Sequence, residues 1–462
     1  MCMLRKRKSL IGLIGVLVLL VGMLSGCLGG TSATGGSGKK GVVQLKFTYW
    51  GDPLEKKSIE DILKAFNKSH PNIYVTGQQI QGNYLEKMTT MASSNTLPDV
   101  GYFTEGSLSP WVKSGAIKDL KPLFDSGEFG DKLKYSIFQY EKDGPIAGSS
   151  VANEVNNIYY NKELFDELGM PYPPAKAEDA WTWDEFVDVA KKLTVDRNGK
   201  HPDDPGFDPK NIKTYGVSNF TYFYENFLFS NDGGIISEDG KTILLNKPET
   251  IEALQRMQDL MYVYHVMPTP ASLSTLPNTD TALLTKRVAM DVDGQWAMQV
   301  LGEAEKQKNL KLGIGVLPKM KKAVTSSAGT PIVVFNNDNT KKHWNETKEF
   351  LKFIMDPSNS LPLIQAGLWM PNEEKWYKDP ELVKKWTDTK IHPKEYKTAV
   401  IDWAMNNVQK NPNYFWADRS EASQIISPAL DLIWTNKKSA QEAVNDIMPK
   451  LKKKFGDKYK YE

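Results

Sequence analysis

Residues 42–80 read VVQLKFTYWGDPLEKKSIEDILKAFNKSHPNIYVTGQQI, and this stretch predicts a strand, a helix and a second strand in succession. Apolar side chains alternate from Val43 to Tyr49, as in a strand with one buried face. A capping box at Ser58 and Asp61 is expected to begin the helix, which would end at His70-Pro71. Its apolar face would consist of Ile59, Ile62, Leu63 and Phe66.

The same order of strand and helix continues along the chain. A strand over 73–80 is followed by a helix through Tyr84 and by a short strand opening at Pro98-Asp99-Val100. Further on, capping boxes are expected at Thr182–Glu185 and Ser439–Glu442, helix starts near Thr250 and Asn345, and strands over 288–292 and 312–317. No fixed internal period appears, which argues against a solenoid or propeller. Strands that alternate with helices predict an α/β protein with mostly parallel sheets covered by helices.

Composition excludes several functional classes. The 462 residues contain 58 Lys and Arg against 56 Asp and Glu, so the net charge is only +2. This balance, without a basic stripe, speaks against a nucleic-acid-binding protein. The aromatic content is high, with 12 Trp, 19 Tyr and 18 Phe, which is more than a core alone would require.

The first 26 residues resemble a targeting segment. Arg5 to Lys8 form a charged start, an apolar run extends from Leu10 to Leu24, and Leu24-Ser25-Gly26-Cys27 follows. This ending resembles the lipobox of bacterial lipoproteins, which implies cleavage after residue 26 and a lipid on Cys27. A plain secretory signal with an incidental cysteine is the alternative.

Residues 27–41 would then tether the protein to the membrane. The stretch 28–41 reads LGGTSATGGSGKKG, a flexible composition, and a diacyl anchor gives lasting attachment. Cys2 and Cys27 are the only cysteines of the sequence, so the processed chain would have neither a disulfide nor a thiol nucleophile. The expected location is the extracellular face of the cell membrane.

A series of short motifs follows in chain order. They are Trp50-Gly51, LPDV at 97–100, YYNKELF at 159–165, TWDEF at 182–186, DGG at 232–234, VAM at 288–290, GQW at 294–296 and GIGVLP at 313–318. Together with the lipobox they resemble the extracellular solute-binding proteins of bacterial ABC importers, specifically the sugar-binding branch that includes maltose-binding protein. The resemblance covers nearly all of residues 42–455. One departure is the segment Gly329-Thr330-Pro331, which lacks the glycine-rich run often found there.

The resemblance implies a two-lobed fold with the ligand in a cleft between the lobes. The first α/β lobe would comprise 42–150 plus 331–366, and the second 151–330 plus 367–462. Chain crossovers are expected near 149–154, 328–332 and 367–372. The implied partners are a carbohydrate, most simply an oligosaccharide, and the membrane permease of the importer. We expect a monomer without cofactor or metal and without enzymatic activity.

Aromatic candidates for stacking on sugar rings come first. Trp296 follows a strand at a sheet edge, where open α/β sheets bind ligands, and it matches a sugar-stacking position of the family. Trp416, Phe223 and Tyr224 match other family positions, and Trp50 follows the first strand. Each of these rings could instead be part of the core. Tyr84, which begins a helix near the expected cleft, is the weakest candidate.

Carboxylates could accept hydrogen bonds from sugar hydroxyls. Glu154 lies on an expected crossover strand and matches an acidic ligand contact of the family. Asp52 and Glu55 follow the first strand, and Glu105 follows the third, which places all of them at the expected cleft edge. Asp52 could equally be a turn or cap residue.

Two further hypotheses concern metal and catalysis. The segment Asp196-Arg197-Asn198-Gly199 weakly resembles a calcium loop, but Phe207 occupies the twelfth position and prolines interrupt it, which favours an ordinary loop. Paired carboxylates could also make a secreted glycoside hydrolase, and a binder of a non-sugar solute is another alternative. Catalytic motifs such as His-Glu-x-x-His, Gly-x-Ser-x-Gly and a P-loop do not occur in the sequence.

Overall fold

A computed structural model describes residues 41–140, 143–387 and 389–462. The expected signal peptide 1–26, the lipidated Cys27 and the tether up to residue 40 lie outside these described residues. Residues Val43–Glu462 form one compact unit. No helix in the described ranges combines the length and the apolar character needed to cross a bilayer.

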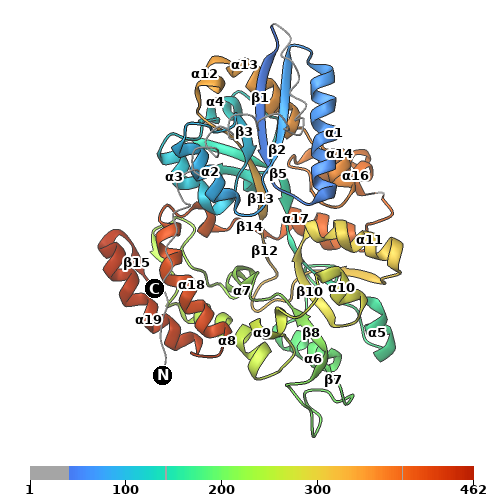
Figure 1. Cartoon of the computed structure of the whole chain (residues 1–462). Helices are drawn as coiled ribbons and strands as arrows, with labels where there is room; N and C mark the ends of the chain where they lie inside the picture. The colour runs from blue at the N-terminus through green and yellow to red at the C-terminus, as the bar shows by residue number, and fades with distance from the viewer. Residues whose placement is uncertain (1–40, 141–142, 388) are drawn as a thin grey trace, which may run out of the picture. The chain divides into compact units, whose positions relative to one another are not determined.

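The unit contains two mixed sheets, drawn one above the other in Figure 1. The first has the order β2 (Ile73–Gln79), β1 (Val43–Tyr49), β3 (Val100–Tyr102), β13 (Ala328–Val334), β5 (Ile146–Glu154), β4 (Ile137–Gln139). The second has the order β11 (Leu312–Gly315), β6 (Asn156–Asn161), β10 (Val288–Gly294), β8 (Ile212–Ser218), β7 (Val195–Asp196). Two short pairs join β12 (Thr325–Ser326) to β14 (Val408–Gln409) and β9 (Thr242–Ile243) to β15 (Lys460–Tyr461).

The expectation of mostly parallel sheets is wrong. In the first sheet only β1 pairs in parallel, with β2 and β3, whereas β3–β13, β13–β5 and β5–β4 are antiparallel. In the second sheet β10–β8 is parallel, whereas β10–β6, β11–β6 and β7–β8 are antiparallel. The reason is topological: the chain leaves the first sheet along β5 and returns along its neighbour β13, so these strands run in opposite directions.

The helices of the N-terminal half cover both sheets. They are α1 (Pro53–Ser69), α2 (Tyr84–Ser93), α3 (Leu108–Lys113), α4 (Lys121–Asp125), α5 (Lys162–Leu168), α6 (Trp183–Leu193) and α7 (Tyr224–Ser230), with short η1 (Glu105–Ser107) and η2 (Lys134–Ser136). In the first sheet α1 packs on β2, and in the second α6 packs on β8 (Figure 1).

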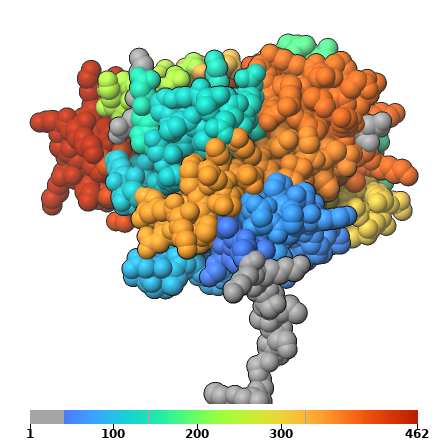
Figure 2. Space-filling view, turned by 90° about the horizontal axis from the view of Figure 1, so that it is seen from above, coloured from blue at the N-terminus to red at the C-terminus, as the bar shows by residue number. Residues whose placement is uncertain are grey.

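The helices of the C-terminal half complete the layers. They are α8 (Pro248–Tyr262), α9 (Pro270–Leu273), α10 (Thr279–Leu284), α11 (Met298–Lys308), α12 (Asp338–Lys342), α13 (Trp344–Met355), α14 (Leu361–Gln365), α15 (Lys375–Lys378), α16 (Pro380–Thr387), α17 (Trp403–Asn406), α18 (Arg419–Trp434) and α19 (Ala440–Phe455). Shorter segments are η3 (Gln295–Ala297), the π-helical η4 (Lys397–Asp402), η5 (Pro412–Phe415) and η6 (Gly456–Lys458). In Figure 2 the orange surface of the later chain adjoins the blue surface of the N-terminal elements, because α13 packs against α1.

Helix starts agree with the sequence at two places and differ at three, one of them Thr250, which lies inside α8 because that helix begins at Pro248. The capping boxes of α6 at Thr182 and of α19 at Ser439 are confirmed. Helix α1, however, begins at Pro53 and not near Ser58, because Asp52 accepts the N–H groups of Leu54 and Glu55, both at 2.8 Å. Helix α13 begins at Trp344, so Asn345 lies inside it.

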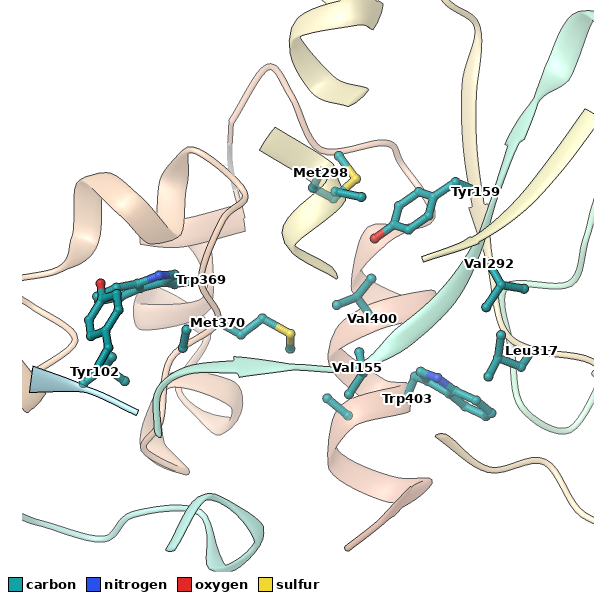
Figure 3. Close-up of a cluster of buried hydrophobic side chains, with 14 of the residues drawn as sticks. Tyr102, Val155, Tyr159, Val292, Met298, Leu317, Trp369, Met370, Val400 and Trp403 are labelled. Carbon is teal, nitrogen blue, oxygen red and sulfur yellow. The ribbon is translucent and has the colours of Figure 1, made fainter. Parts of the chain in front are cut away.

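One hydrophobic cluster extends through both sheets. Figure 3 shows it passing from Tyr102 and Trp369 through Val155 to Val292 and Leu317. Val155 lies between the end of β5 and the start of β6, where the chain passes from the first sheet to the second. The side chains behind this crossing are therefore packed in a shared core.

Candidate functional site

A cavity of about 540 Å³ lies beside this crossing and takes side chains from the elements of both sheets. The aromatic residues that line it, within the described ranges, are Trp50, Tyr222, Phe223, Tyr224, Trp296, Trp369 and Tyr414. The lining carboxylates of the same ranges are Glu55, Glu105, Glu154 and Glu225. A few polar groups and many rings around a concave space form a typical small-molecule site.

The ring of Trp50 is held in place from behind by two tyrosines. It packs edge-on against Tyr84 and Tyr102, with centroids 5.0 and 5.1 Å away. Tyr84 is buried, bonds Thr48 through its hydroxyl and donates to the Tyr102 carbonyl at 2.9 Å. The candidate Tyr84 thus does not line the cavity but supports Trp50.

Trp296 enters the cavity from the second sheet. Strand β10 ends at Gly294, and η3 then turns the half-buried Trp296 ring toward Phe223. The centroids of these two rings are 6.0 Å apart. A Cβ atom added to Gly294 would lie 1.9 Å from this ring, so only glycine leaves room for it. Two of the aromatic candidates are therefore neighbours at the same wall.

Glu55 projects from the first turn of α1 and is almost fully buried. The Tyr102 hydroxyl donates to it at 3.2 Å, and the Trp369 side chain donates as well. Burial, which outweighs these bonds, raises the pKa of the Glu55 carboxyl from 4.5 to about 7.

Glu154 ends β5 and lies among other acids. Burial, followed by repulsion from Glu105, Glu55 and Asp293, raises its pKa well above the ordinary value. Burial likewise raises the pKa of Glu105, whose carboxylate accepts the backbone N–H of Gly329. Asp293, half-buried at the end of β10, has a pKa raised to about 7 by burial and by Asp291.

Arg419 brings a positive charge into the cavity from the start of α18. Its guanidinium lies 5.3 Å from the Tyr414 ring centroid, and its buried Nε has no hydrogen-bond partner among the described residues. Its charge opposes the burial effects at Glu105 and Glu225. Glu225 also accepts the side-chain amides of Asn411 and, at 2.7 Å, Asn413.

Two candidates lie elsewhere. Asp52 caps α1, so the cap interpretation holds for it, and it is absent from the lining. Trp416 is 3% exposed and packs between Phe455 and Tyr459, with centroids 6.2 and 5.7 Å away, so it belongs to the core. The structure thus brings together Trp50, Glu55, Glu105, Glu154, Phe223, Tyr224 and Trp296 of the ten ligand-binding candidates.

Several lining residues were missed by the sequence reasoning. Tyr222 and Glu225 flank the Phe223-Tyr224 pair, and Tyr414 lies two residues before Trp416, so these local motifs were found while individual positions were not. Trp369 falls in the crossover expected at 367–372. Arg419 had no signal, because a lone arginine after an aromatic cluster has many structural uses.

The oxygens of the Asp196 carboxylate already accept hydrogen bonds from the backbone, which speaks against the calcium hypothesis for this loop. These oxygens accept the backbone N–H groups of Asn198, Lys200 and Asp208 at 2.8–2.9 Å. Over the described ranges, no three His, Cys, Asp or Glu side chains are grouped as metal ligands.

The Glu55 pKa predicts how stability changes with pH. Between pH 4.5 and about 7 the unfolded chain has lost this proton while the folded protein retains it, so folding stability falls as the pH rises. We expect this group to contribute a loss of about 3 kcal/mol over that window. Urea unfolding of the Glu55→Gln variant at about pH 5 and about pH 7.5 should show a correspondingly smaller pH dependence.

The matched control for that experiment is Glu60→Gln, on an exposed position of the same helix. It should leave the pH dependence of the parent unchanged. Identical curves for Glu55→Gln and the parent would contradict the raised pKa.

Comparisons with known proteins agree with this architecture. The family model described as bacterial extracellular solute-binding protein matches residues 61–391. Among curated relatives, a multiple sugar-binding protein of Streptococcus mutans is 20% identical over 359 residues, covering 74% of this chain and 78% of its own. An arabinooligosaccharide-binding protein of Halalkalibacterium halodurans is 26% identical over 237 residues, covering 49% of this chain and 48% of its own.

Solved structures share the fold over almost the whole chain. An ABC substrate-binding protein of Listeria monocytogenes in complex with cycloalternan superposes with a TM-score of 0.74 at 21% identity, covering 90% of this chain and 99% of that one. Maltose-bound MalE3 of T. maritima gives 0.70 at 20% identity, with coverages of 89% and 99%. The chain therefore belongs to the bacterial extracellular solute-binding proteins, with the two-lobed α/β fold of the sugar-binding branch, as its motifs predicted.

Proposed function

We propose that this protein is the lipid-anchored, extracellular solute-binding subunit of an ABC importer, and that it captures an oligosaccharide in the cavity at Glu154 and delivers it to a membrane permease. The observation that carries the proposal is the lining of this cavity, which combines aromatic rings with carboxylates. Sugar C–H faces pack on rings and sugar hydroxyls donate to carboxylates, so each group of the lining has a counterpart on a saccharide. The relatives named for sugars support the same substrate class.

Binding would close the two lobes around the ligand. In this proposal the first lobe comprises 42–150 plus 331–366 and the second 151–330 plus 367–462. Ligand favours the closed state only through contacts that it makes with both lobes, and the lining offers Trp50 and Glu55 on one side and Trp296 and Phe223 on the other. The closed protein, as a monomer, would then dock on the permease.

The chain itself would perform no reaction. The proteins that it resembles are named as binding proteins. Incubation with labelled oligosaccharides should return them intact, and release of shorter products would favour the glycoside hydrolase.

Binding is tested with a panel of neutral oligosaccharides of different sugars and linkages. Thermal-shift screening detects a ligand because binding to the folded state raises the melting temperature. Mass spectrometry of material retained through mild purification identifies the natural solute. If no saccharide binds and a peptide or metal complex does, the proposed substrate class is wrong.

Membrane attachment is tested separately. In Cys27→Ala the lipidated residue is lost, so we expect the protein to move from the membrane fraction to the culture medium. Immunoblots of both fractions measure this, with Cys2→Ala as the matched control because residue 2 would be removed with the signal peptide. Retention of Cys27→Ala at the membrane would contradict the anchor.

A further inference from the structure

Glu154 differs from the other carboxylates of the cavity. Glu55 accepts the Tyr102 hydroxyl, Glu105 accepts the Gly329 N–H, and Glu225 accepts two asparagine amides. Within the part of the chain that the structure describes, no backbone or side-chain donor bonds the Glu154 carboxylate. The charged groups that add to the rise of its pKa are Glu105, Glu55 and Asp293, all acidic.

The charges of the lining are unequally distributed. Four glutamates face the cavity, and the basic residue among the described lining is Arg419. The guanidinium lies beside Gly106 and Tyr414, where its charge acts on Glu105 and Glu225. Neither Glu55 nor Glu154 forms an ion pair in the described ranges. Among the described residues, the Glu55–Glu154 side of the cavity therefore holds acidic groups and no basic one.

The same side is lined by rings. Trp50 follows β1 directly before the helix of Glu55, and Trp369 donates to the Glu55 carboxylate. Aromatic faces attract organic cations, and a nearby carboxylate adds a charge-assisted hydrogen bond. A metal ion is less suited, because the described residues hold no grouped set of ligands.

We propose that the solute of this cavity carries a protonated amine, as an amino sugar does, and that its ammonium group binds Glu154. This inference rests on the proposed function and narrows its substrate class. The ammonium supplies both the donor that Glu154 lacks and the positive charge that this side of the cavity lacks. The remainder of the sugar occupies the ring-lined space toward Trp296 and Arg419.

The test compares sugars that differ at one substituent. Calorimetric titrations use glucosamine, glucose and N-acetylglucosamine, the corresponding galactose and mannose series, and β-1,4 glucosamine, glucose and N-acetylglucosamine disaccharides. In at least one series we expect the amine to bind roughly 10- to 100-fold more tightly than its hydroxyl and acetamido counterparts. Equal or tighter binding of the neutral members, or no binding of any amine, overturns the inference.

Variants assign the preference to Glu154. Glu154→Gln keeps the shape and removes the charge, so it should lower amine affinity at least tenfold and abolish the preference over neutral analogues. Glu154→Asp, which keeps the charge, should retain part of the preference for the amine. Glu238→Gln, on an exposed loop, is the control and should bind as the parent does. If Glu154→Gln keeps the full amine preference, the assignment of the ammonium site to Glu154 is wrong. A melting temperature equal to that of the parent verifies that each variant is folded.

Failure of this inference is distinguishable from failure of the proposed function. If a neutral oligosaccharide of the panel binds and the amines do not, the solute-binding function stands and the amine proposal falls. If neither kind of saccharide binds, both fall. If an amine without a sugar ring, such as ethanolamine, binds more tightly than every saccharide, the proposed sugar class is wrong.

Discussion

Replacing Trp296 by alanine is expected to weaken saccharide binding by roughly 1.5–3 kcal/mol, or about 10- to 150-fold, with little loss of folding stability. The ring is half-buried at the cavity wall beside Phe223 and lies within η3, so its removal takes away a contact surface for the ligand and opens no hole in the core. Calorimetric titration with the solute identified by mass spectrometry measures the loss.

Two further variants serve as controls for the Trp296→Ala prediction. Trp416→Ala removes a ring of equal size that is 3% exposed outside the cavity lining, so it should destabilise the fold by about 3–5 kcal/mol. Its remaining folded fraction should bind normally. Gly294→Ala places a methyl group 1.9 Å from the unshifted Trp296 ring, so it should reproduce the binding defect without removing the ring. Near-parental affinity in Trp296→Ala would assign this ring to the core.

Removing the Lys132 side chain is expected to cost about 3–5 kcal/mol of folding stability. Its side chain is 1% exposed, and its ammonium donates to Glu373 at 2.7 Å, to Asn372 at 3.0 Å and to the Met355 carbonyl at 2.7 Å. Lys132→Ala leaves a buried carboxylate and two buried acceptors without this donor. Chemical denaturation of the variant measures the change in the free energy of unfolding.

The control is Lys134→Ala, two residues away and exposed, which should change stability by less than about 0.5 kcal/mol. If both variants unfold at the same denaturant concentration as the parent, the buried pair contributes nothing. Lys132→Ala should also loosen the segment 367–372, because Asn372 donates in turn to the Ser150 carbonyl of β5 at 2.9 Å. Faster hydrogen exchange around Met370, whose amide bonds Asn153, would report this.

Local structure followed closely from local sequence. The Val43–Tyr49 alternation gives β1, and the Thr182 and Ser439 capping boxes begin α6 and α19, because the interactions concerned join residues at most four positions apart. The cap of α1 lies six residues before the expected one, for a reason that is also local. Asp52 followed by Pro53 is a stronger start than Ser58 with Asp61, which instead pairs with Lys57 and Lys64.

Residue roles at the cavity were harder to predict. Tyr414 and Trp416 lie in one motif, and one faces the cavity while the other packs under Tyr459, since the turn of η5 points alternate rings in different directions. The sequence likewise does not show that the Tyr84 side chain lies behind Trp50 and not in the cavity lining. Composition and motif order indicate which segments approach a ligand, but the direction of a side chain depends on what packs against it.

The family, the order of strands and helices and the ring-rich, acid-rich character of the site are already contained in the amino-acid order, because each depends on short-range pattern or on motifs in series. The antiparallel pairing of β5 with β13, the position of Glu154 away from any donor of the described residues and the entry of Arg419 into the cavity depend on residues that lie tens to hundreds of positions apart. Such long-range juxtapositions arise only when the chain crosses between its two sheets and packs, and they decide which charges the cavity leaves for a ligand to meet.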